Sequence, residues 1–145
     1  MATKRLLENE EYKQNSQITT VYSDFNHFFK ANPFTGDIGR KINVESVKQS
    51  IRNIVLTNKY ERLRNPDFGS NLRRFLFENY NEYRTGEEIG REIVRTIERY
   101  EPRAEVINVN VTNDEDSNSI DVQIKYSIRM VDSEETLNLK LYRVR

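Results

Sequence analysis

Cysteine and tryptophan are absent from this chain of 145 residues, and histidine occurs once, as His27. Without cysteine there can be no disulfide framework, no thiolate nucleophile and no cysteine-based zinc or iron–sulfur site. A single histidine excludes a metal site built on a histidine pair within one subunit. The sequence therefore predicts a protein that uses neither a metal nor another cofactor.

Long apolar runs are absent as well. The longest contain three residues, at 54–56 and 75–77, whereas a membrane-spanning helix needs about 20. Residues 1–17 contain no apolar stretch of the kind found in signal peptides. We therefore expect a soluble protein that is made in the cytoplasm and does not associate with membranes.

The remaining composition suits one domain. Hydrophobic residues make up 36% of the chain and charged residues 32%, with 23 basic side chains balancing 23 acidic ones. A chain of this length can bury about two thirds of its unfolded surface, which is enough for a single core. Its zero net charge argues against a general nucleic-acid binder.

The charge is unevenly distributed along the chain. Residues 40–74 carry nine basic and three acidic side chains, whereas residues 75–121 carry five basic and twelve acidic ones. Two interpretations stay open: solvated faces that intermix in the fold, or complementary docking surfaces in an assembly. A nucleic-acid-binding module on residues 40–74 is a further alternative, although Lys48 and Arg52 more simply occupy the solvent side of a helix.

The N-terminal half predicts an arm, a strand and two helices. Residues 1–17 are polar and charged, which is typical of a mobile arm, and β-branched and aromatic residues predict a short strand near residues 18–22. Asn43 is a good N-cap for a helix, and Ser70 can cap a second, short one. The first helix presents one apolar stripe, formed by Val44, Val47, Ile51, Ile54 and Val55.

The C-terminal half predicts a helix followed by strands. The T-x-x-E spacing at Thr85 is a capping box, and the helix that it opens must end before Pro102. The hydrophobic period then changes from 3.6 to 2, which predicts strands over 107–111, 120–130 and 137–141.

The predicted class is α+β, with two to three helices packed on a small C-terminal antiparallel meander. Residues 18–145 form a single domain behind the N-terminal arm. A three-stranded meander has two edges, and an edge that stays open can accept a strand from another chain.

Recognisable catalytic motifs are missing. The chain contains no G-x-S-x-G, no P-loop and no G-x-G-x-x-G, and His27, which lies among aromatic residues, is interpreted as structural. Carboxylate pairs exist, but 23 acidic residues make close pairs inevitable. Glu101 is the one acid at a constrained position, and its neighbour Arg103 should lower its pKa, whereas a general acid needs a raised one.

The tetrapeptide at residues 100–103 (YEPR) has two interpretations. It can be a helix stop with a surface ion pair worth under about 1 kcal/mol. It can also be a rigid corner that presets the forked side chain of Arg103 and the carboxylate of Glu101 for polar docking. On the docking interpretation, replacing Arg103 with alanine weakens assembly and leaves the stability of the monomer nearly unchanged.

Several short motifs follow one another in a specific order: Thr35-Gly36-Asp37, Glu61-Arg62, Phe68-Gly69, Leu76-Phe77-Glu78 and Glu101-Pro102-Arg103. In this order and spacing, residues 18–145 resemble the baseplate wedge protein family of contractile-tailed phages, which is shared with the sheath-initiating baseplate component of type VI secretion systems. Family members often have glycine just before the E-R pair, where this chain has Tyr60.

The resemblance implies a structural, non-enzymatic component of the virion tail baseplate, assembled in the host cytoplasm. It implies that Glu101, Pro102 and Arg103 bind the wedge core bundle, with Glu61 and Arg62 as further partner-binding residues. It also implies that a sheet edge accepts strands from the first ring of the tail sheath and initiates sheath polymerisation, with the tail tube as a further neighbour. Because some members carry a lysozyme label, a muramidase-like cell-wall hydrolase is the alternative.

Overall fold

The computed structural model describes residues 20–31, 33, 35–76, 84–114, 116–131 and 133–142. The predicted arm over residues 1–17 lies outside this part of the chain, as do Phe77 and Glu78 of the L-F-E motif. Among the described helices, none has the length and apolar character needed to cross a lipid bilayer.

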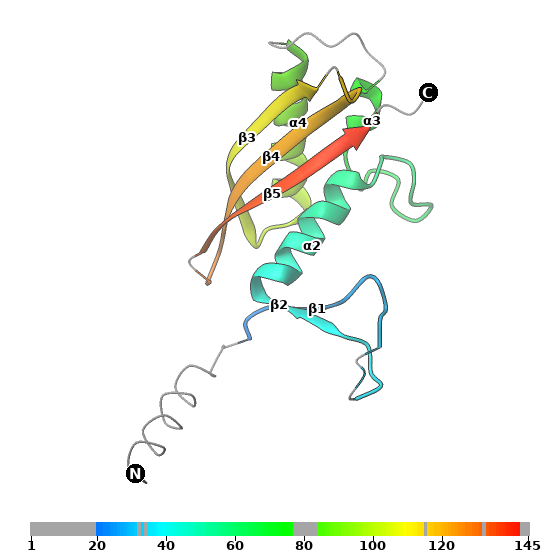
Figure 1. The fold of residues 1–145 in the computed structure, drawn as a ribbon, viewed down its shortest axis with the longest axis vertical. Coiled ribbons are helices and arrows are strands. Elements are labelled where there is room, and N and C mark those ends of the chain that lie inside the picture. Colours follow the sequence, from blue (N-terminus) through cyan, green and yellow to red (C-terminus); the bar gives the residue numbers. More distant parts are fainter. Residues whose placement is uncertain are drawn as a thin grey trace.

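The predicted α+β class is confirmed. The elements follow in the order β1 (Ser23–Phe25), β2 (Arg40–Ile42), α2 (Asn43–Leu56), α3 (Leu72–Phe75), α4 (Arg84–Tyr100), β3 (Ala104–Asp114), β4 (Ser119–Ile128) and β5 (Ser133–Tyr142). The last three strands form the predicted antiparallel meander in the order β3-β4-β5, and β1 pairs with β2 in a separate hairpin. The hairpin lies at the N-terminal end of α2 (Figure 1).

One layer of helices covers one face of the meander. Helix α4 packs along β3, and α2 contacts both α4 and β5. The alternation along β4 places five side chains of this strand in the core, because successive residues of a strand point to opposite faces. The helices contribute residues at spacings of three and four. The core residues from these three elements are Val47, Ile51, Val55, Ile89, Ile93, Ile97, Ile120, Val122, Ile124, Tyr126 and Ile128.

The register of β3 differs from the predicted alternation. A β-bulge shifts the pairing between Val106 and Asn108, so that Val106 packs against the core and Ile107 stays 48% exposed. The expectation that Ile107 shares the inner face with Val109 and Val111 is therefore wrong. A bulge inserts one extra residue, and a strict period of two cannot anticipate it.

Two predicted helix caps are replaced by tertiary hydrogen bonds. Asn43 is the first residue of α2 rather than its N-cap, and its Oδ1 accepts hydrogen bonds from the backbone N–H groups of Val21 and Tyr22, at 2.9 and 3.1 Å. The hydroxyl of Ser70 donates to the carbonyl oxygen of Val55, at 2.6 Å, instead of capping α3. Both polar side chains bind another segment, and sequence spacing alone does not reveal such partners.

The loop between α2 and α3 returns against the C-terminal end of α2. Its closing hydrogen bond runs from the Ser70 N–H to the Thr57 carbonyl oxygen, at 2.8 Å. Gly69 has φ +103°, and a Cβ atom placed there would overlap the Thr57 carbonyl group. Glycine at position 69 of the F-G motif is therefore required both by the left-handed backbone and by the close contact with Thr57.

We expect Gly69→Ala to lower the free energy of unfolding by about 3 kcal/mol, because the methyl group adds overlap with Thr57 to the strain of a left-handed backbone. Gly36→Ala is the matched control, since Gly36 has φ +69° but open space around it. The free energy of unfolding of Gly36→Ala should fall by only about 1 kcal/mol. Urea unfolding of both variants measures the difference, and equal losses would contradict the importance of the Thr57 contact.

Candidate functional site

The chain turns sharply where α4 meets β3. Tyr100 ends the helix, as predicted, and the backbone of Glu101 is held on both sides. Its N–H donates to the Ile97 carbonyl oxygen, at 2.7 Å, and its own carbonyl oxygen accepts from the Ala104 N–H, at 3.1 Å. Pro102 lies between these bonds and is exposed, so residues 101–103 form a rigid corner at the surface.

The side chains of this corner form a forked ion pair. Arg103 donates from Nε to Glu101 Oε1, at 2.5 Å, and from Nη2 to Oε2, at 2.6 Å. The side chain of Glu101 is only 2% exposed and that of Arg103 30%. The interpretation as a surface ion pair is therefore wrong for the carboxylate. The pair is a charge-assisted, bidentate contact whose acidic half lies inside the fold.

The surroundings of Glu101 explain its ionisation. Burial by itself would raise the pKa of Glu101, but the guanidinium of Arg103 and a hydrogen bond from Ser50 of α2 outweigh it and hold the pKa below the ordinary value of 4.5. The same contact raises the pKa of Arg103. The expectation that Arg103 lowers the pKa of Glu101 is confirmed, and the carboxylate is a poor proton donor at neutral pH.

Arg103 also holds three segments together. Its guanidinium lies 5.4 Å from the ring centroid of Tyr22, and its carbonyl oxygen accepts a hydrogen bond from the Arg129 N–H, at 2.9 Å. The Tyr22 hydroxyl donates to the Arg129 carbonyl oxygen, at 3.1 Å. The corner therefore links the N-terminal hairpin, the start of β3 and the end of β4, and Tyr22 is a member of the site that the sequence did not reveal.

A ring contact connects the corner with the E-R motif. Arg62 lies over the ring of Phe68, at 3.9 Å, and Phe68 packs against Tyr100 at a centroid distance of 4.8 Å. The Tyr100 hydroxyl then donates to the Asp67 carbonyl oxygen, at 2.6 Å. Two motifs about 40 residues apart in the sequence thus belong to one side of the molecule, joined through the aromatic residue that precedes Glu101.

Glu61 and Arg62 have different environments within that loop. Glu61 Oε2 accepts the Asn58 N–H, at 2.8 Å, and so stabilises the loop itself. The residue before it, Tyr60, has φ +68°. This is the left-handed backbone that glycine adopts most easily, which explains why glycine suits this position. Both Glu61 and Arg62 are exposed.

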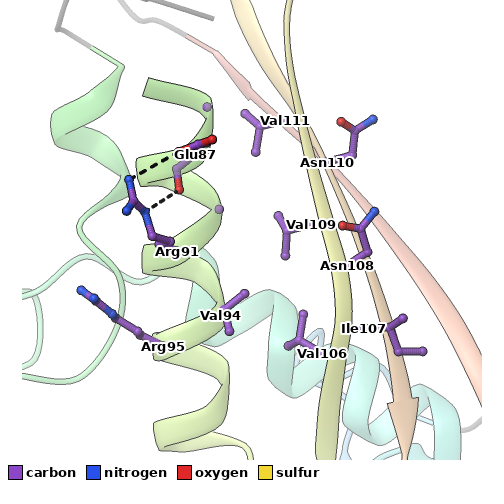
Figure 2. A pocket seen from close by; sticks show the side chains of 12 residues that line it. Glu87, Arg91, Val94, Arg95, Val106, Ile107, Asn108, Val109, Asn110 and Val111 are labelled. Atoms are coloured by element: carbon purple, nitrogen blue, oxygen red, sulfur yellow. Dashed lines mark hydrogen bonds and ion pairs between the residues drawn. The ribbon is translucent and has the colours of Figure 1, made fainter. Parts of the chain in front are cut away.

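A groove of about 740 Å³ is lined by residues of α4 and of the edge strand β3. Gly86, Gly90 and Val94 line its helical side. Val106, Val109 and Val111 point from β3 toward α4 (Figure 2). The two glycines, four residues apart in an amphipathic helix, are the sequence signal that could have revealed it, because glycine weakens a helix interior by about 1 kcal/mol.

Two carboxyl groups of the described residues have lowered pKa values. Although burial opposes them, Arg103 and Ser50 lower the pKa of Glu101. Hydrogen bonds from Ser117 and Lys140 lower the pKa of Asp114 to about 2. Glycoside hydrolysis needs one carboxylic acid with a raised pKa. Neither Glu101 nor Asp114 therefore has the raised pKa that a general acid needs.

We expect Arg103→Ala to lower the free energy of unfolding by about 3 kcal/mol at neutral pH, because it leaves the carboxylate of Glu101 buried without its partner. This replaces the sequence-based expectation of unchanged stability. Because folding lowers the pKa of Glu101, the stabilisation in the native protein is complete above pH 4.5 and is lost as the pH falls through the lower folded value. Thermal unfolding between pH 3 and 7 should therefore show that the difference in melting temperature between the variant and the native protein becomes smaller at acid pH. A difference that stays constant with pH would contradict this account.

The chain matches a known protein family. The family model for baseplate wedge protein gp25 matches residues 43–133. The baseplate wedge protein gp25 of Enterobacteria phage T4 is 32% identical over 113 residues, which span 78% of this chain and 84% of that protein.

Solved structures share the fold. A candidate tail lysozyme from Geobacter sulfurreducens has a TM-score of 0.64 at 27% identity, covering 70% of this chain and 91% of that one. A chain of the anti-feeding prophage baseplate has a TM-score of 0.59 at 22% identity, covering 86% and 87%. The matched segment contains the E-R motif, the F-G motif and the Glu101–Arg103 corner, and the chain therefore belongs to the baseplate wedge gp25 family, as a structural component of a phage-tail baseplate.

Proposed function

We propose that this protein joins the baseplate in the host cytoplasm, docks on the wedge core bundle through residues 101–103 and the adjoining E-R loop, and offers a sheet edge that initiates polymerisation of the tail sheath. The observation that carries the docking proposal is the forked pair of Glu101 and Arg103, which fixes a partly exposed arginine at a rigid corner.

The three corner residues have different roles in this proposal. Glu101 is too buried to meet a partner, so it acts by orienting Arg103. An arginine has five N–H donors, and two of those of Arg103 are committed to Glu101. The rest can donate to carboxylate or carbonyl oxygens of the wedge. Pro102 supplies an exposed, rigid apolar contact beside them.

The E-R loop extends the same docking surface. Arg62 lies over the ring of Phe68, and a guanidinium that is already held in place loses less conformational entropy when it binds a partner. Glu61 acts locally, through its bond to Asn58.

A nucleic-acid role for residues 40–74 finds less support. These residues are spread over β2, α2, the following loop and α3. Lys59 is committed to Glu92 at 2.8 Å, and Lys41 lies 3.9 Å from Glu45. A continuous cationic track along one face is what phosphate binding requires.

Docking can be tested with variants that keep the fold. Arg103→Lys retains a charge for Glu101 but loses the fork, and Pro102→Ala removes the exposed ring. We expect each to bind purified wedge core proteins at least about tenfold more weakly, with only a modest loss of thermal stability.

Arg73→Lys, at an exposed arginine on α3, is the matched control and should bind like the native protein. If both corner variants also bind normally in calorimetry, the docking role of residues 101–103 is wrong.

The hydrolase alternative rests on the name of the Geobacter sulfurreducens structure. We propose that this chain is not an enzyme, because the pKa values of Glu101 and Asp114 are lowered and neither carboxyl group is suited to act as a general acid. Purified protein should leave peptidoglycan suspensions unchanged between pH 4 and 8. Clearing that is lost in Glu101→Gln but not in a control such as Glu98→Gln would overturn this conclusion.

A further inference from the structure

A second hollow, which we call the α2 pocket, lies between the segment after β1, one face of α2 and β5. Its volume is about 440 Å³, and its lining residues from outside α2 are His27, Phe28, Lys41 and Leu137. Because the hairpin lies at the N-terminal end of α2 (Figure 1), the segment after β1 comes to lie beside the helix. The α2 pocket shares no residue with the corner at residues 101–103 or with the E-R loop, so the docking proposed above does not account for it.

Basic side chains dominate the charge of the α2 pocket. The helix contributes Glu45, Lys48, Gln49 and Arg52, and the three charged ones follow at spacings of three and four, which place them on one helix face. With Lys41, three basic residues therefore share the pocket with a single acidic one. The side chain of Glu45 is 60% exposed and lies 3.9 Å from Lys41, so it compensates for one of the three charges at most.

Lys48 and Arg52 have no ion-pair partner among the described residues. The expectation that both occupy the solvent side of a helix holds for Arg52, which is exposed, whereas Lys48 is half-buried. Burial removes part of the water that hydrates an ammonium group, and two like charges four residues apart on a helix repel each other. An anion placed between the two side chains would offset both effects, so the α2 pocket favours an anionic ligand.

The wall of the pocket is held in place by α2 itself. Gln49 is 5% exposed, and its Nε2 donates to the Phe25 carbonyl oxygen, at 2.8 Å. Its Oε1 accepts a hydrogen bond from Nδ1 of His27, at 2.9 Å, and the His27 ring lies against Phe28 at a centroid distance of 3.9 Å. A buried side chain of the helix thus fixes the segment that carries Phe28, and a wall that is already fixed loses little conformational entropy when a ligand binds.

One wall of the α2 pocket is an exposed aromatic ring. Phe28 is 66% exposed, whereas Leu137 of the sheet is buried. Phe25 and Phe29, on either side of it in the sequence, are exposed as well. Burial of an aromatic ring stabilises a contact in proportion to the area that leaves water. A ligand that suits the pocket therefore combines a negative charge with an apolar side chain.

Nucleic acids and acidic protein segments both carry anionic groups, but the pocket suits the protein segment better. A nucleic acid presents a row of phosphates, which a continuous cationic track binds, whereas these cations are gathered in one hollow beside Glu45. A protein segment can supply one carboxylate for the forked guanidinium of Arg52 and an apolar neighbour for Phe28. Because the chain is a structural component of a phage-tail baseplate, other baseplate proteins are its neighbours.

We propose that the α2 pocket binds an acidic segment of another baseplate protein. A carboxylate of this segment pairs with Lys48 and Arg52, and an apolar residue next to it packs on Phe28. This site is additional to the docking surface proposed above and does not depend on it.

Charge reversal at Arg52 tests the electrostatic half of the proposal. Arg52→Glu should have an unchanged melting temperature, because the new carboxylate lies four residues after Lys48 and can pair with it. Its affinity for baseplates assembled without this protein should fall at least tenfold, because the carboxylate repels the acidic segment and occupies Lys48.

Two variants are the controls for this experiment. Arg73→Glu makes the same charge change at an exposed residue of α3 and should bind these baseplates like the native protein, and Arg52→Lys should retain most of the affinity. Normal binding of Arg52→Glu, or an equal loss with Arg73→Glu, would overturn the proposal.

Cross-linking with a carbodiimide identifies the occupant, because this reagent joins a lysine amine to a carboxylate in contact with it. In native baseplates, Lys48 should become linked to an aspartate or glutamate of another baseplate protein, which mass spectrometry locates. The pair of Lys59 and Glu92, at 2.8 Å, is the internal control for the reaction. Links from Lys48 to copies of this chain alone, or no link where Lys59 reacts, would overturn the proposal. Loss of the Arg52-dependent binding on nuclease treatment would assign the pocket to nucleic acid and overturn it as well.

Discussion

The forked pair between Glu101 and Arg103 is the interaction on which the arrangement of the molecule depends. A carboxylate that is almost completely buried is tolerable only because a guanidinium meets both of its oxygens. By occupying that position, Arg103 also comes to lie against Tyr22 and next to the end of β4. A single ion pair is thereby in contact with Tyr22, which precedes β1, and lies where α4 meets the meander.

The corner and the groove lie at different places along the α4–β3 unit. The corner is rigid and polar, and it presents a small exposed part of a well-held arginine. The groove has a mixed lining, with valines beside Glu87 and Arg91, and one of its walls is an edge strand that pairs on one side only within the described chain. A protein that docks on one partner and then initiates polymerisation of a second partner needs a separate surface for each of these contacts. The first contact requires a fixed geometry, and the second requires a surface that is stabilised by the arriving strand.

Much of the framework follows from local pattern. The alternation from Ile120 to Met130 predicted the central strand, although the strand ends at Ile128 and Met130 is exposed. The spacing of Ile89, Ile93 and Ile97 predicted the face of α4 that packs on the core. Pro102 set the end of the helix. These predictions hold because each reflects a period that the backbone imposes on neighbouring residues. The prediction was wrong in β3, where a β-bulge adds one residue to the strand. As a result Val106, and not Ile107, packs against the core.

The sequence by itself determined the class of the fold, the position of the corner and the motif order that identified the family, because these are encoded by residues close together in the chain. Only the tertiary structure decided that Glu101 is buried, that Asn43 and Ser70 bind distant backbone instead of capping helices, and that Gly90 faces an open groove. Each of these depends on what a segment many residues away places beside the side chain, and burial is a property of that packing rather than of the local sequence.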